Sequence, residues 1–334
     1  MSKPDLTLGG KFRGRDWIVT QEWTVPEIEE LLGLSTELKR RFREGLPTRV
    51  LPDKTVFLMF FDNSTRTRNS FEAGATQLGA HAHFISSETS QIAHGESAKD
   101  TGIILSRYGH GIAIRHDKIP GEGNAYEREV ARWADKPVLN MQCDVDHPCQ
   151  TLADLMTMRE KLGADLRGRK IAVSWAYTKT YAKPLSVPQG LITLLTRFGM
   201  DVVLAHPPEF RLMADQLEIA GKNAAECGGR FRVTNSMEDA FEGADVVYPK
   251  SWGCLDLFAK PEDSLWLSEA YHSWICDEAH MKLAKPDALY MHCLPADRGR
   301  EVTDAVIDGP NSVVYDEAEN RLHTCKALMA ALMS

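Results

Sequence analysis

The segment Phe61-Asp-Asn-Ser-Thr-Arg-Thr-Arg-Asn-Ser-Phe71 follows a nearly continuous apolar run, Thr55 to Phe61. Such a run predicts a strand that is covered on both faces, as in a parallel sheet. Apolar side chains then recur at helical spacing, which predicts a helix over Thr67 to Leu78. Residues Ser64 to Thr67 therefore stand where a buried strand passes into a helix, the repeating unit of an α/β fold.

The entrance of this helix is rich in hydrogen-bond donors. Its first backbone N–H groups are unpaired and the positive end of the helix dipole points outward. The hydroxyls of Ser64, Thr65 and Thr67 and the guanidinium groups of Arg66 and Arg68 add further donors. A serine or threonine that only caps the helix, beside arginines that solvate its first turn, is the structural alternative. Two arginines in a first turn oppose the dipole, so the set favours a binding site for an oxyanion.

Length and composition restrict the class of protein. The 334 residues are enough for two domains, and the net charge of −8 argues against a nucleic-acid partner. No signal segment and no membrane-spanning apolar stretch is evident, and the seven cysteines lack C-x-x-C spacing. We therefore expect a cytoplasmic protein whose cysteines are mostly core thiols, with no membrane partner and no structural zinc.

Strand-like and helix-like segments alternate along the chain and predict two doubly wound parallel-sheet domains with a cleft between them. We assign residues 1–150 to the first domain, joined by the C-terminal helix 317–334, and residues 151–316 to the second. The polar, turn-rich stretch 163–168 precedes the first strand of the second domain. Strands are expected at 55–61, 81–85, 111–115, 138–140, 170–176, 201–205, 245–248 and 288–292. Helices are expected at 26–43, 67–78, 98–108, 125–134, 151–162, 188–198, 210–225 and 317–333.

A dinucleotide-binding fold is the structural competitor. Its glycine-rich turn, G-x-G-x-x-G, should follow the first strand of either domain. The chain has Asp62-Asn-Ser-Thr-Arg66 after one strand and Tyr177-Thr-Lys-Thr-Tyr181 after the other. We therefore do not expect NAD, or any other cofactor.

Polar residues at strand ends are further candidates. Arg115 ends a predicted strand, and the carboxyl ends of parallel strands collect ligands, although a surface arginine there is also common. His147-Pro-Cys-Gln150 pairs a histidine with a glutamine and offers donors to a carbonyl and an amide, or forms a simple turn at Pro148. His81 and His83 share one face of a strand, but no carboxylate or cysteine completes a zinc site, so we expect them to pack.

These motifs together resemble the aspartate/ornithine carbamoyltransferase superfamily. Its order of motifs is Ser-Thr-Arg-Thr-Arg, an arginine at a strand end, His-Pro-x-Gln and His-Cys-Leu-Pro, which is His292-Cys-Leu-Pro295 here. The resemblance continues through Glu301-Val302 and Glu319-Asn-Arg-Leu-His323 and covers roughly Lys54 to Met333. Cys149 replaces a usual threonine, but the family uses the groups that match His147 and Gln150.

The resemblance implies a site for carbamoyl phosphate without a metal. Residues matching Ser64, Thr65, Arg66 and Thr67 hold the phosphate, and those matching Thr67, Arg115 and His147 reach the carbamoyl oxygen. Gln150 and the backbone of Cys293 and Leu294 match positions that take the carbamoyl NH2, and Arg321 belongs to the same set. An amine would attack the carbonyl while these donors stabilise the oxyanion and phosphate leaves. Cys293 has a binding role in this family and is not a nucleophile.

The acceptor amine is less well defined by the sequence. Ornithine carbamoyltransferases carry a Ser-Met-Gly loop preceded by an aspartate, whereas this chain has Tyr248-Pro-Lys-Ser-Trp-Gly253. Trp252 replaces the methionine, and Lys250 either meets an acceptor carboxylate or faces solvent. Lys179-Thr-Tyr-Ala-Lys-Pro-Leu185 resembles the proline-bearing loop of the knotted N-acylornithine transcarbamylases, so a knot is expected in the second domain. The chain most resembles the YgeW-like carbamoyltransferases of that branch.

The loop His94-Gly-Glu-Ser-Ala-Lys-Asp100 matches one that the family sends into the active site of a neighbouring subunit. The structural alternative is a flexible polar loop. If it reaches across, the protein is at least a homotrimer with sites at subunit interfaces, and His94 or Lys99 binds phosphate or the acceptor in trans. Arg298 is a further candidate for the acceptor or carbamoyl phosphate.

We therefore predict a carbamoyltransferase whose acceptor is a small amino acid or related carboxylate, neither ornithine nor aspartate. The same groups would also serve the reverse reaction, in which phosphate cleaves a ureido acid to give carbamoyl phosphate. A non-catalytic regulator that binds carbamoyl phosphate is the alternative from another class, and an oxidoreductase is a more distant one. The sequence does not fix the acceptor, the direction or the oligomer size.

Overall fold

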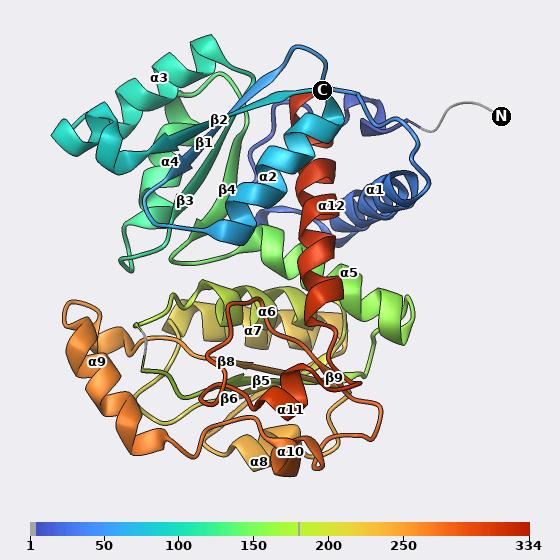
Figure 1. The fold of residues 1–334 in the computed structure, drawn as a ribbon, viewed down its shortest axis with the longest axis vertical. Coiled ribbons are helices and arrows are strands. Elements are labelled where there is room, and N and C mark those ends of the chain that lie inside the picture. The colour runs from blue at the N-terminus through green and yellow to red at the C-terminus, as the bar shows by residue number, and fades with distance from the viewer. Residues whose placement is uncertain (1–4, 180) are drawn as a thin grey trace. The chain divides into compact units, whose positions relative to one another are not determined.

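A computed structural model describes residues 5–179 and 181–334, and the chain divides into two compact units. Unit 1 contains the residues up to Met156 together with Glu319–Ser334, and unit 2 contains Thr157–Ala318. The boundaries fall inside two helices, α5 (Pro148–Leu162) and α12 (Val314–Met333). Figure 1 shows that each unit has a sheet with helices on both faces.

Unit 1 is built on a four-stranded parallel sheet with the order β2-β1-β3-β4. All four strands that the sequence predicts are present. Their near-continuous apolar runs are buried, except in the edge strand β2, where the side chains alternate between exposed and half-buried. The strands are β1 (Thr55–Phe60), β2 (His81–Ser86), β3 (Gly111–His116) and β4 (Val138–Cys143).

Helices cover both faces of this sheet. In Figure 1, α3 and α4 lie on one face, and α1, α2 and α12 lie on the other. Gly74 explains the close packing of α2 on α12, because a Cβ there would lie 3.1 Å from Lys326 and Met329. The helices are α1 (Val25–Arg43), α2 (Thr65–Leu78), α3 (Ala98–Tyr108) and α4 (Gly123–Trp133), besides α5 and α12.

Unit 2 is built on a five-stranded parallel sheet with the order β7-β6-β5-β8-β9. The sequence analysis missed one strand, β7, because its residues Arg-Phe-Arg-Val-Thr are largely exposed at the sheet edge and carry no apolar run. The strands are β5 (Lys170–Trp175), β6 (Asp201–Ala205), β7 (Arg230–Thr234), β8 (Val246–Lys250) and β9 (Leu289–Tyr290).

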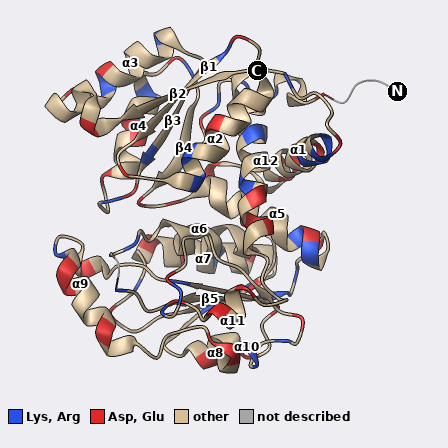
Figure 2. Ribbon diagram, viewed as in Figure 1, with Lys and Arg blue, Asp and Glu red and all other residues tan. Residues whose placement is uncertain are grey.

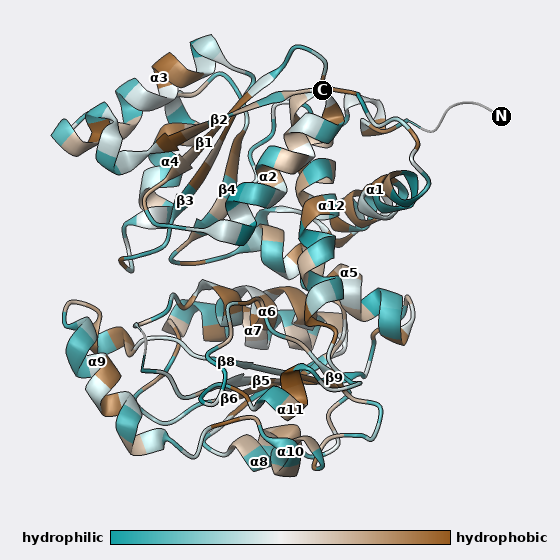
Figure 3. Ribbon diagram, in the orientation of Figure 1, coloured by the Kyte–Doolittle hydropathy of each residue, from teal (hydrophilic) through white to brown (hydrophobic). Residues whose placement is uncertain are grey.

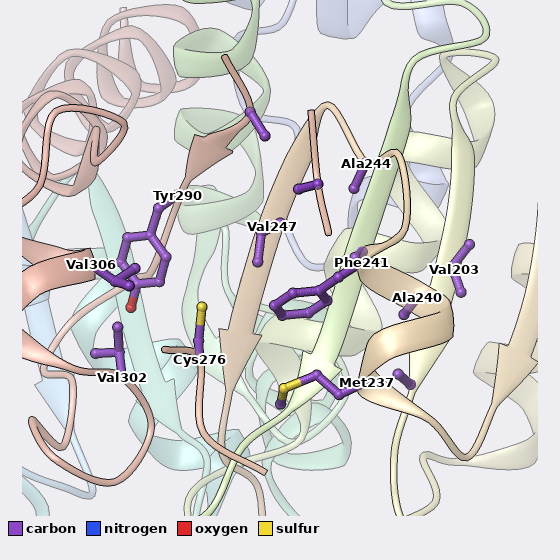
Figure 4. Close-up of a cluster of buried hydrophobic side chains, with 14 of the residues drawn as sticks. Val203, Met237, Ala240, Phe241, Ala244, Val247, Cys276, Tyr290, Val302 and Val306 are labelled. Atoms are coloured by element: carbon purple, nitrogen blue, oxygen red, sulfur yellow. The ribbon is translucent and has the colours of Figure 1, made fainter. Parts of the chain in front are cut away.

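The helices of unit 2 also form two layers, with α6 and α7 on one face and α8, α10 and α11 on the other (Figure 1). Figure 4 shows the apolar core on the second face, where Phe241 and Met237 of α8 meet Val203 and Val247 of the sheet. Figure 3 shows hydrophobic colour concentrated on the strands of both units. The helices are α6 (Ser186–Arg197), α7 (Ala214–Cys227), α8 (Met237–Phe241), α9 (Pro261–Ser268), α10 (Glu278–Met281) and α11 (Asp304–Ile307).

The structure also bears on several other predictions made from the sequence. The structure confirms the α/β fold class with two parallel sheets. Six of the seven free cysteines are buried, as expected, and Cys227 is exposed. His81 and His83 are exposed, but the His83 ring packs edge-on against Phe57 with 5.7 Å between the ring centroids, so the expected packing role holds for His83. The predicted knot stays a prediction, and residue 180 of its loop lies outside the described residues.

No helix within residues 5–179 and 181–334 is both long and apolar enough to cross a membrane.

Candidate active site

The predicted anion site lies at the switch point of the unit 1 sheet. From β1 the chain first moves to β2 on one side and then returns to β3 on the other, so the carboxyl ends of β1 and β3 flank a crevice. The segment after β1 leads into α2, and Arg115 lies near the end of β3. Figure 2 colours this end of β3 blue, in a sheet with few other charged residues.

Helix α2 begins two residues earlier than expected, at Thr65, and Ser64 is its N-cap. The Ser64 hydroxyl accepts a hydrogen bond from the Thr67 N–H at 3.2 Å. A pocket of about 110 Å³ borders Ser64 and Arg68, but Thr67 and Arg115 do not line it. Arg68 was expected to add donors there, but its guanidinium pairs with Glu72 at 2.8 Å and stacks on Phe84. The structural alternative therefore holds for Arg68, and its capping role is also observed, at Ser64.

Two arginines converge on the hydroxyl of Thr67, which is buried. Arg321 of α12 donates to Thr67 Oγ1 at 2.6 Å, and Arg115 Nη1 donates to the same atom at 3.4 Å. Arg115 is held by Asp117, whose carboxylate accepts from Nη2 at 2.8 Å. Because both lone pairs of the hydroxyl oxygen are engaged, its hydrogen must be donated elsewhere. The Thr67 hydroxyl therefore keeps its hydrogen for an acceptor other than these two arginines.

Helix α5 begins at Pro148, three residues earlier than expected, which places Gln150 in its first turn. The carbonyl of His147 accepts from the N–H of Gln150 at 2.9 Å and of Thr151 at 3.1 Å. The Gln150 side chain is fully buried, and its Oε1 accepts from Arg321 Nη1 at 2.7 Å. The turn at Pro148 is thus the first turn of α5, and it places the Gln150 side chain within hydrogen-bond distance of Arg321.

His147 shares this site and is held neutral. Burial lowers the pKa of His147 well below its ordinary value, and the nearby charges of Arg321, Arg115 and Arg66 lower it further. Its buried Nδ1 has no hydrogen-bond partner in the described protein. Three guanidinium groups therefore lie near His147, while Asp117 pairs with one of them. Guanidinium groups hold phosphate oxygens through charge-assisted hydrogen bonds, so this cluster suits an oxyanion.

The equivalent switch point of unit 2 lies between β5 and β8, where Trp175 pairs with Lys250 in the sheet register. The solvent-facing alternative for Lys250 is wrong, because the residue is buried and Nζ donates to the Ser251 carbonyl at 2.6 Å. Burial lowers the pKa of Lys250, and the charge of Lys183 lowers it further. Trp252 is completely buried, and its indole N–H donates to the Phe210 carbonyl at 2.8 Å. The structure therefore gives the Trp252 side chain a packing role and no exposed surface for an acceptor.

Glu301 is a buried carboxylate that binds several groups near the end of β8 in unit 2. It was not predicted as a site residue from the sequence. Glu301 Oε1 accepts from the N–H and hydroxyl of Ser251 at 2.7 and 2.6 Å, and Oε2 accepts from Lys183 Nζ and Asp297 N at 2.7 Å each. Although burial opposes its ionisation, His292, Lys183 and Lys250 hold the pKa of Glu301 well below its usual range. Lys183 belongs to the Lys179–Leu185 segment and Glu301 to the Glu301-Val302 pair quoted above. Their ion pair could not be predicted, because no rule of sequence spacing links two residues so far apart in the chain.

The His292-Cys-Leu-Pro295 segment follows β9 and is fixed by a second buried carboxylate. Glu317 accepts from the His292 N–H at 2.9 Å and from the Tyr248 hydroxyl at 3.0 Å. Leu294 adopts the left-handed region at φ 54°, which is costly for a residue with a Cβ and is often found at functional sites. Its N–H donates to His292 Nδ1 at 2.8 Å. The backbone of Cys293 and Leu294 is thus held in one conformation.

Three other candidates, Arg298, His94 and Lys99, are not among the residues that hydrogen-bond to Thr67 or Glu301 in the described part of the chain. Arg298 forms ion pairs with Asp304 at 2.6 Å and Asp308 at 2.5 Å, so its charge is already compensated. His94 is exposed, and Lys99 stacks on Trp133 of its own chain with Nζ 4.2 Å from the ring centroid. Among the described residues, no group of three or more histidines, cysteines or carboxylates is arranged to hold a metal ion.

Comparison with known proteins assigns the family. The description "Aspartate/ornithine carbamoyltransferase, carbamoyl-P binding domain" matches residues 15–160, and "Aspartate/ornithine carbamoyltransferase, Asp/Orn binding domain" matches residues 184–332. "Putative carbamoyltransferase YgeW" of Escherichia coli (strain K12) is 40% identical over 94% of this chain and 89% of its own length. The chain belongs to the aspartate/ornithine carbamoyltransferase family. It is therefore a transferase enzyme, as the motifs predicted.

Solved structures of carbamoyltransferases share the fold. Acetylornithine transcarbamylase complexed with acetylcitrulline has a TM-score of 0.87 and 35% identity, covering 96% of this chain and 99% of that chain. Ornithine carbamoyltransferase from Pyrococcus furiosus also has a TM-score of 0.87, with 37% identity over 96% of this chain and 98% of that chain. These two carbamoyltransferases are named for different acceptors, so likeness alone does not determine the acceptor of this one.

Proposed function

We propose that this carbamoyltransferase moves the carbamoyl group between carbamoyl phosphate and the amine of a small carboxylate-bearing acceptor that is neither ornithine nor aspartate. The convergence of Arg115 and Arg321 on Thr67, at the entrance of α2, is the observation that carries the proposal. Thr67 and Arg115 lie within residues 15–160, which match the carbamoyl-P binding description, whereas Arg321 lies within residues 184–332, which match the Asp/Orn binding description.

The phosphate would bind the N–H groups at the start of α2, beside Ser64, Thr65 and Arg66. The carbamoyl oxygen would then receive hydrogen bonds from the Thr67 hydroxyl, Arg115 and His147. As a neutral amine attacks the carbonyl carbon, negative charge develops on that oxygen, and preorganised donors stabilise it more than they stabilise the ground state. The C–O bond to phosphate then breaks. Gln150 and the backbone of Cys293 and Leu294 would hold the carbamoyl NH2.

The amine must lose a proton during this reaction. His147 is a poor base for it, because burial and its three arginine neighbours lower its pKa. The leaving phosphate is more basic and is formed next to the attacking amine, so we propose that it accepts the proton. His147 then acts as a hydrogen-bond donor to the carbamoyl oxygen and needs no change of charge.

The loop after β8 supports an acceptor other than ornithine. Ser251 gives both its N–H and its hydroxyl to Glu301, and Trp252 fills the core. In sequence, that loop differs from the Ser-Met-Gly loop of ornithine carbamoyltransferases by Trp252 in place of methionine. Lys183 already pairs with Glu301 and Asp297, so we assign the acceptor carboxylate to Lys250, whose Nζ donates to the Ser251 carbonyl in the same unit.

The loop His94 to Asp100 is also proposed to act in trans, which requires at least a trimer. His94 is exposed and therefore accessible to a second subunit. Sedimentation of the purified protein with and without carbamoyl phosphate measures the oligomer. A monomer that turns over substrate would exclude a contribution of this loop to a neighbouring site.

A colorimetric screen for ureido products tests the function. Carbamoyl phosphate is offered with ornithine, N-acetylornithine, N-succinylornithine, aspartate, putrescine and 2,3-diaminopropionate. A product with one carboxylate-bearing amine other than ornithine or aspartate supports the proposal, and turnover of ornithine or aspartate corrects the acceptor. If the panel is silent, cleavage of ureido acids by phosphate or arsenate tests the reverse direction. Silence in both directions, with carbamoyl phosphate still bound, would favour a regulator.

A further inference from the structure

We propose that Asp154 is a positioning residue of the anion site, which acts through Gln150 to hold Arg321 against Thr67. The inference rests on the proposed function, because it concerns the groups that would contact the carbamoyl end of the ligand. Asp154 lies on α5 one turn after Gln150 and is fully buried, and Gln150 Nε2 donates to its Oδ1 at 2.7 Å.

A continuous series of hydrogen bonds starts from this carboxylate. Gln150 Nε2 donates to Asp154, while Gln150 Oε1 accepts from Arg321 Nη1 at 2.7 Å. Arg321 Nη2 donates to Thr67 Oγ1 at 2.6 Å, and Arg115 donates to the same oxygen at 3.4 Å. These side chains come from four elements, α5, α12, α2 and β3. Asp154 stands at the end of the series that is remote from Thr67.

The chemistry of its two neighbours fixes the orientation of the Gln150 amide. A guanidinium can only donate hydrogen bonds, so the amide oxygen of Gln150 faces Arg321 and its NH2 faces Oδ1 of Asp154, which accepts. The amide is satisfied in one orientation, with its NH2 toward Asp154 and its oxygen toward Arg321. The reverse orientation would place NH2 against guanidinium N–H groups and oxygen against a carboxylate, leaving buried groups unpaired.

A neutral side chain at position 154 would remove this constraint. An asparagine offers both a donor and an acceptor, so either orientation of Gln150 could be satisfied there. In the second orientation Arg321 loses its acceptor, and Thr67 loses a partner that directs its hydrogen toward the ligand. The damage should therefore fall on the carbamoyl end of the site, while the phosphate end beside Ser64 keeps its donors.

Four full-length chains test the inference: wild type, Asp154→Asn, Gln150→Glu/Asp154→Asn and Asp245→Asn. The double variant keeps the total charge and restores the series, because the amide introduced at position 154 can donate to the carboxylate introduced at position 150, which still accepts from Arg321. Asp245 is the matched control, a buried carboxylate of unit 2 that accepts from Arg169, Lys285 and the Lys170 N–H. Calorimetric titration measures the affinity of each chain for carbamoyl phosphate and for inorganic phosphate, and thermal unfolding measures stability.

We expect Asp154→Asn to weaken carbamoyl phosphate binding about tenfold to a hundredfold, the usual effect of a misplaced ligand group. Inorganic phosphate, which lacks the carbamoyl group, should lose less than about threefold, and the double variant should regain most of the lost affinity. The inference would be overturned if Asp154→Asn lost affinity for both ligands equally, or if the folded variant bound carbamoyl phosphate as tightly as wild type. Asp154 would then have only a structural role. Wild type that binds neither ligand overturns the proposed function instead, and the inference with it.

Discussion

Arg321 is the residue on which the anion site depends most, because its two terminal nitrogens reach two different acceptors. Nη1 donates to Gln150 and Nη2 to Thr67, a fork that an ammonium group cannot reproduce. A charge-assisted hydrogen bond contributes about 1.5–3 kcal/mol. We therefore expect Arg321→Lys to weaken carbamoyl phosphate binding about tenfold to a hundredfold. Titration calorimetry measures the change.

Arg43→Lys is the control for this prediction. Arg43 also contacts α12, at Glu319, but its pair is largely exposed and 3.2 Å long. Exposed pairs of this kind contribute about 0–1 kcal/mol, so binding should stay within about threefold of wild type. If Arg321→Lys binds as tightly as Arg43→Lys, the fork has no role in ligand affinity.

The charge state of His147 gives a second prediction for a single residue. Because burial lowers the pKa of His147 well below its ordinary value, ionisation of the ring should not shape activity at pH values near that ordinary value or above it. Profiles of kcat/KM against pH, with carbamoyl phosphate varied, should show no inflection near 6.5 that His147→Asn removes. Such an inflection would mean that His147 exchanges a proton during turnover.

Single residues also show how far the sequence could be interpreted. Ser64, Thr67, Arg115, His147, Gln150 and Arg321 were predicted because each belongs to a motif, and the structure brings Arg321 to both Thr67 and Gln150. Asp154, Asp117 and Glu301 were not predicted as site residues. Each acts through another side chain, and the direction of that contact depends on tertiary packing, which no local pattern records.

Among the elements, α2 combines a helix cap with a ligand site. Ser64→Ala should destabilise the protein by about 0.5–2 kcal/mol, because the Thr67 N–H loses its acceptor. Ser64→Asp should keep the cap, since aspartate is an equally good one, but it places a negative charge where the phosphate would bind. We expect near wild-type unfolding with carbamoyl phosphate affinity reduced by more than about tenfold, measured by chemical denaturation and calorimetry.

Thr24→Asp is the control for Ser64→Asp. It shows whether an aspartate cap on another helix of unit 1 also weakens the binding of carbamoyl phosphate. Thr24 caps α1 in the same unit, where it accepts from the Glu27 N–H. No ligand is predicted at that helix, so aspartate there should change neither unfolding nor binding appreciably. A Ser64→Asp chain with unchanged affinity would show that the entrance of α2 serves the fold alone.

Helix α12 should make unit 1 sensitive to acid. Burial, together with Lys326 and Lys39, lowers the pKa of His323 to about 4, although Glu319 3.6 Å away opposes the shift. Below its ordinary value of 6.5 the unfolded chain takes up a proton that the folded chain refuses. Stability should therefore fall as pH drops from about 6.5 to 4, by up to about 3 kcal/mol from this residue.

Denaturant unfolding of wild type and His323→Gln at pH 7.5 and 4.5 measures this contribution. The variant should be less stable at pH 7.5 but should lose less on acidification. Asp146 titrates in the same range with the opposite sign, because its pKa is raised to about 6, so only the difference between the two chains isolates His323. Equal losses in both chains would place the acid sensitivity elsewhere.

Some strands and helices were easier to predict from the sequence than others. Strands buried on both faces, such as β1 and β3, were predicted because burial demands an apolar run. The edge strand β7 was missed because its residues meet solvent and its polar composition resembles a loop. Helices α2 and α5 began earlier than expected, since a cap at Ser64 and a proline at position 148 set their first turns without an apolar residue.

At the scale of the whole molecule, unit 1 is discontinuous in the chain. The described residues that we place at the phosphate belong to it, and so does Arg321, which comes from its C-terminal piece. The two helices that enter unit 2 end close together, because Lys161 of α5 and Asp316 of α12 form an ion pair of 2.9 Å. A short flexible linker can therefore join Leu162 to Val314 and replace all of the intervening residues.

We expect this shortened chain, residues 1–162 linked to 314–334, to fold and to bind carbamoyl phosphate more weakly than the full chain. Its sheet and both helix layers are intact, whereas Cys293 and Leu294 are absent, and each lost hydrogen bond removes about 0.5–1.5 kcal/mol. Residues 1–162 alone should not bind, because α12 supplies Arg321 and covers α2 at Gly74. Circular dichroism and calorimetry compare the chains, with Arg321→Met in the linked chain as control. Binding that survives Arg321→Met, or that residues 1–162 retain alone, would contradict the assignment of Arg321 to the phosphate-binding unit.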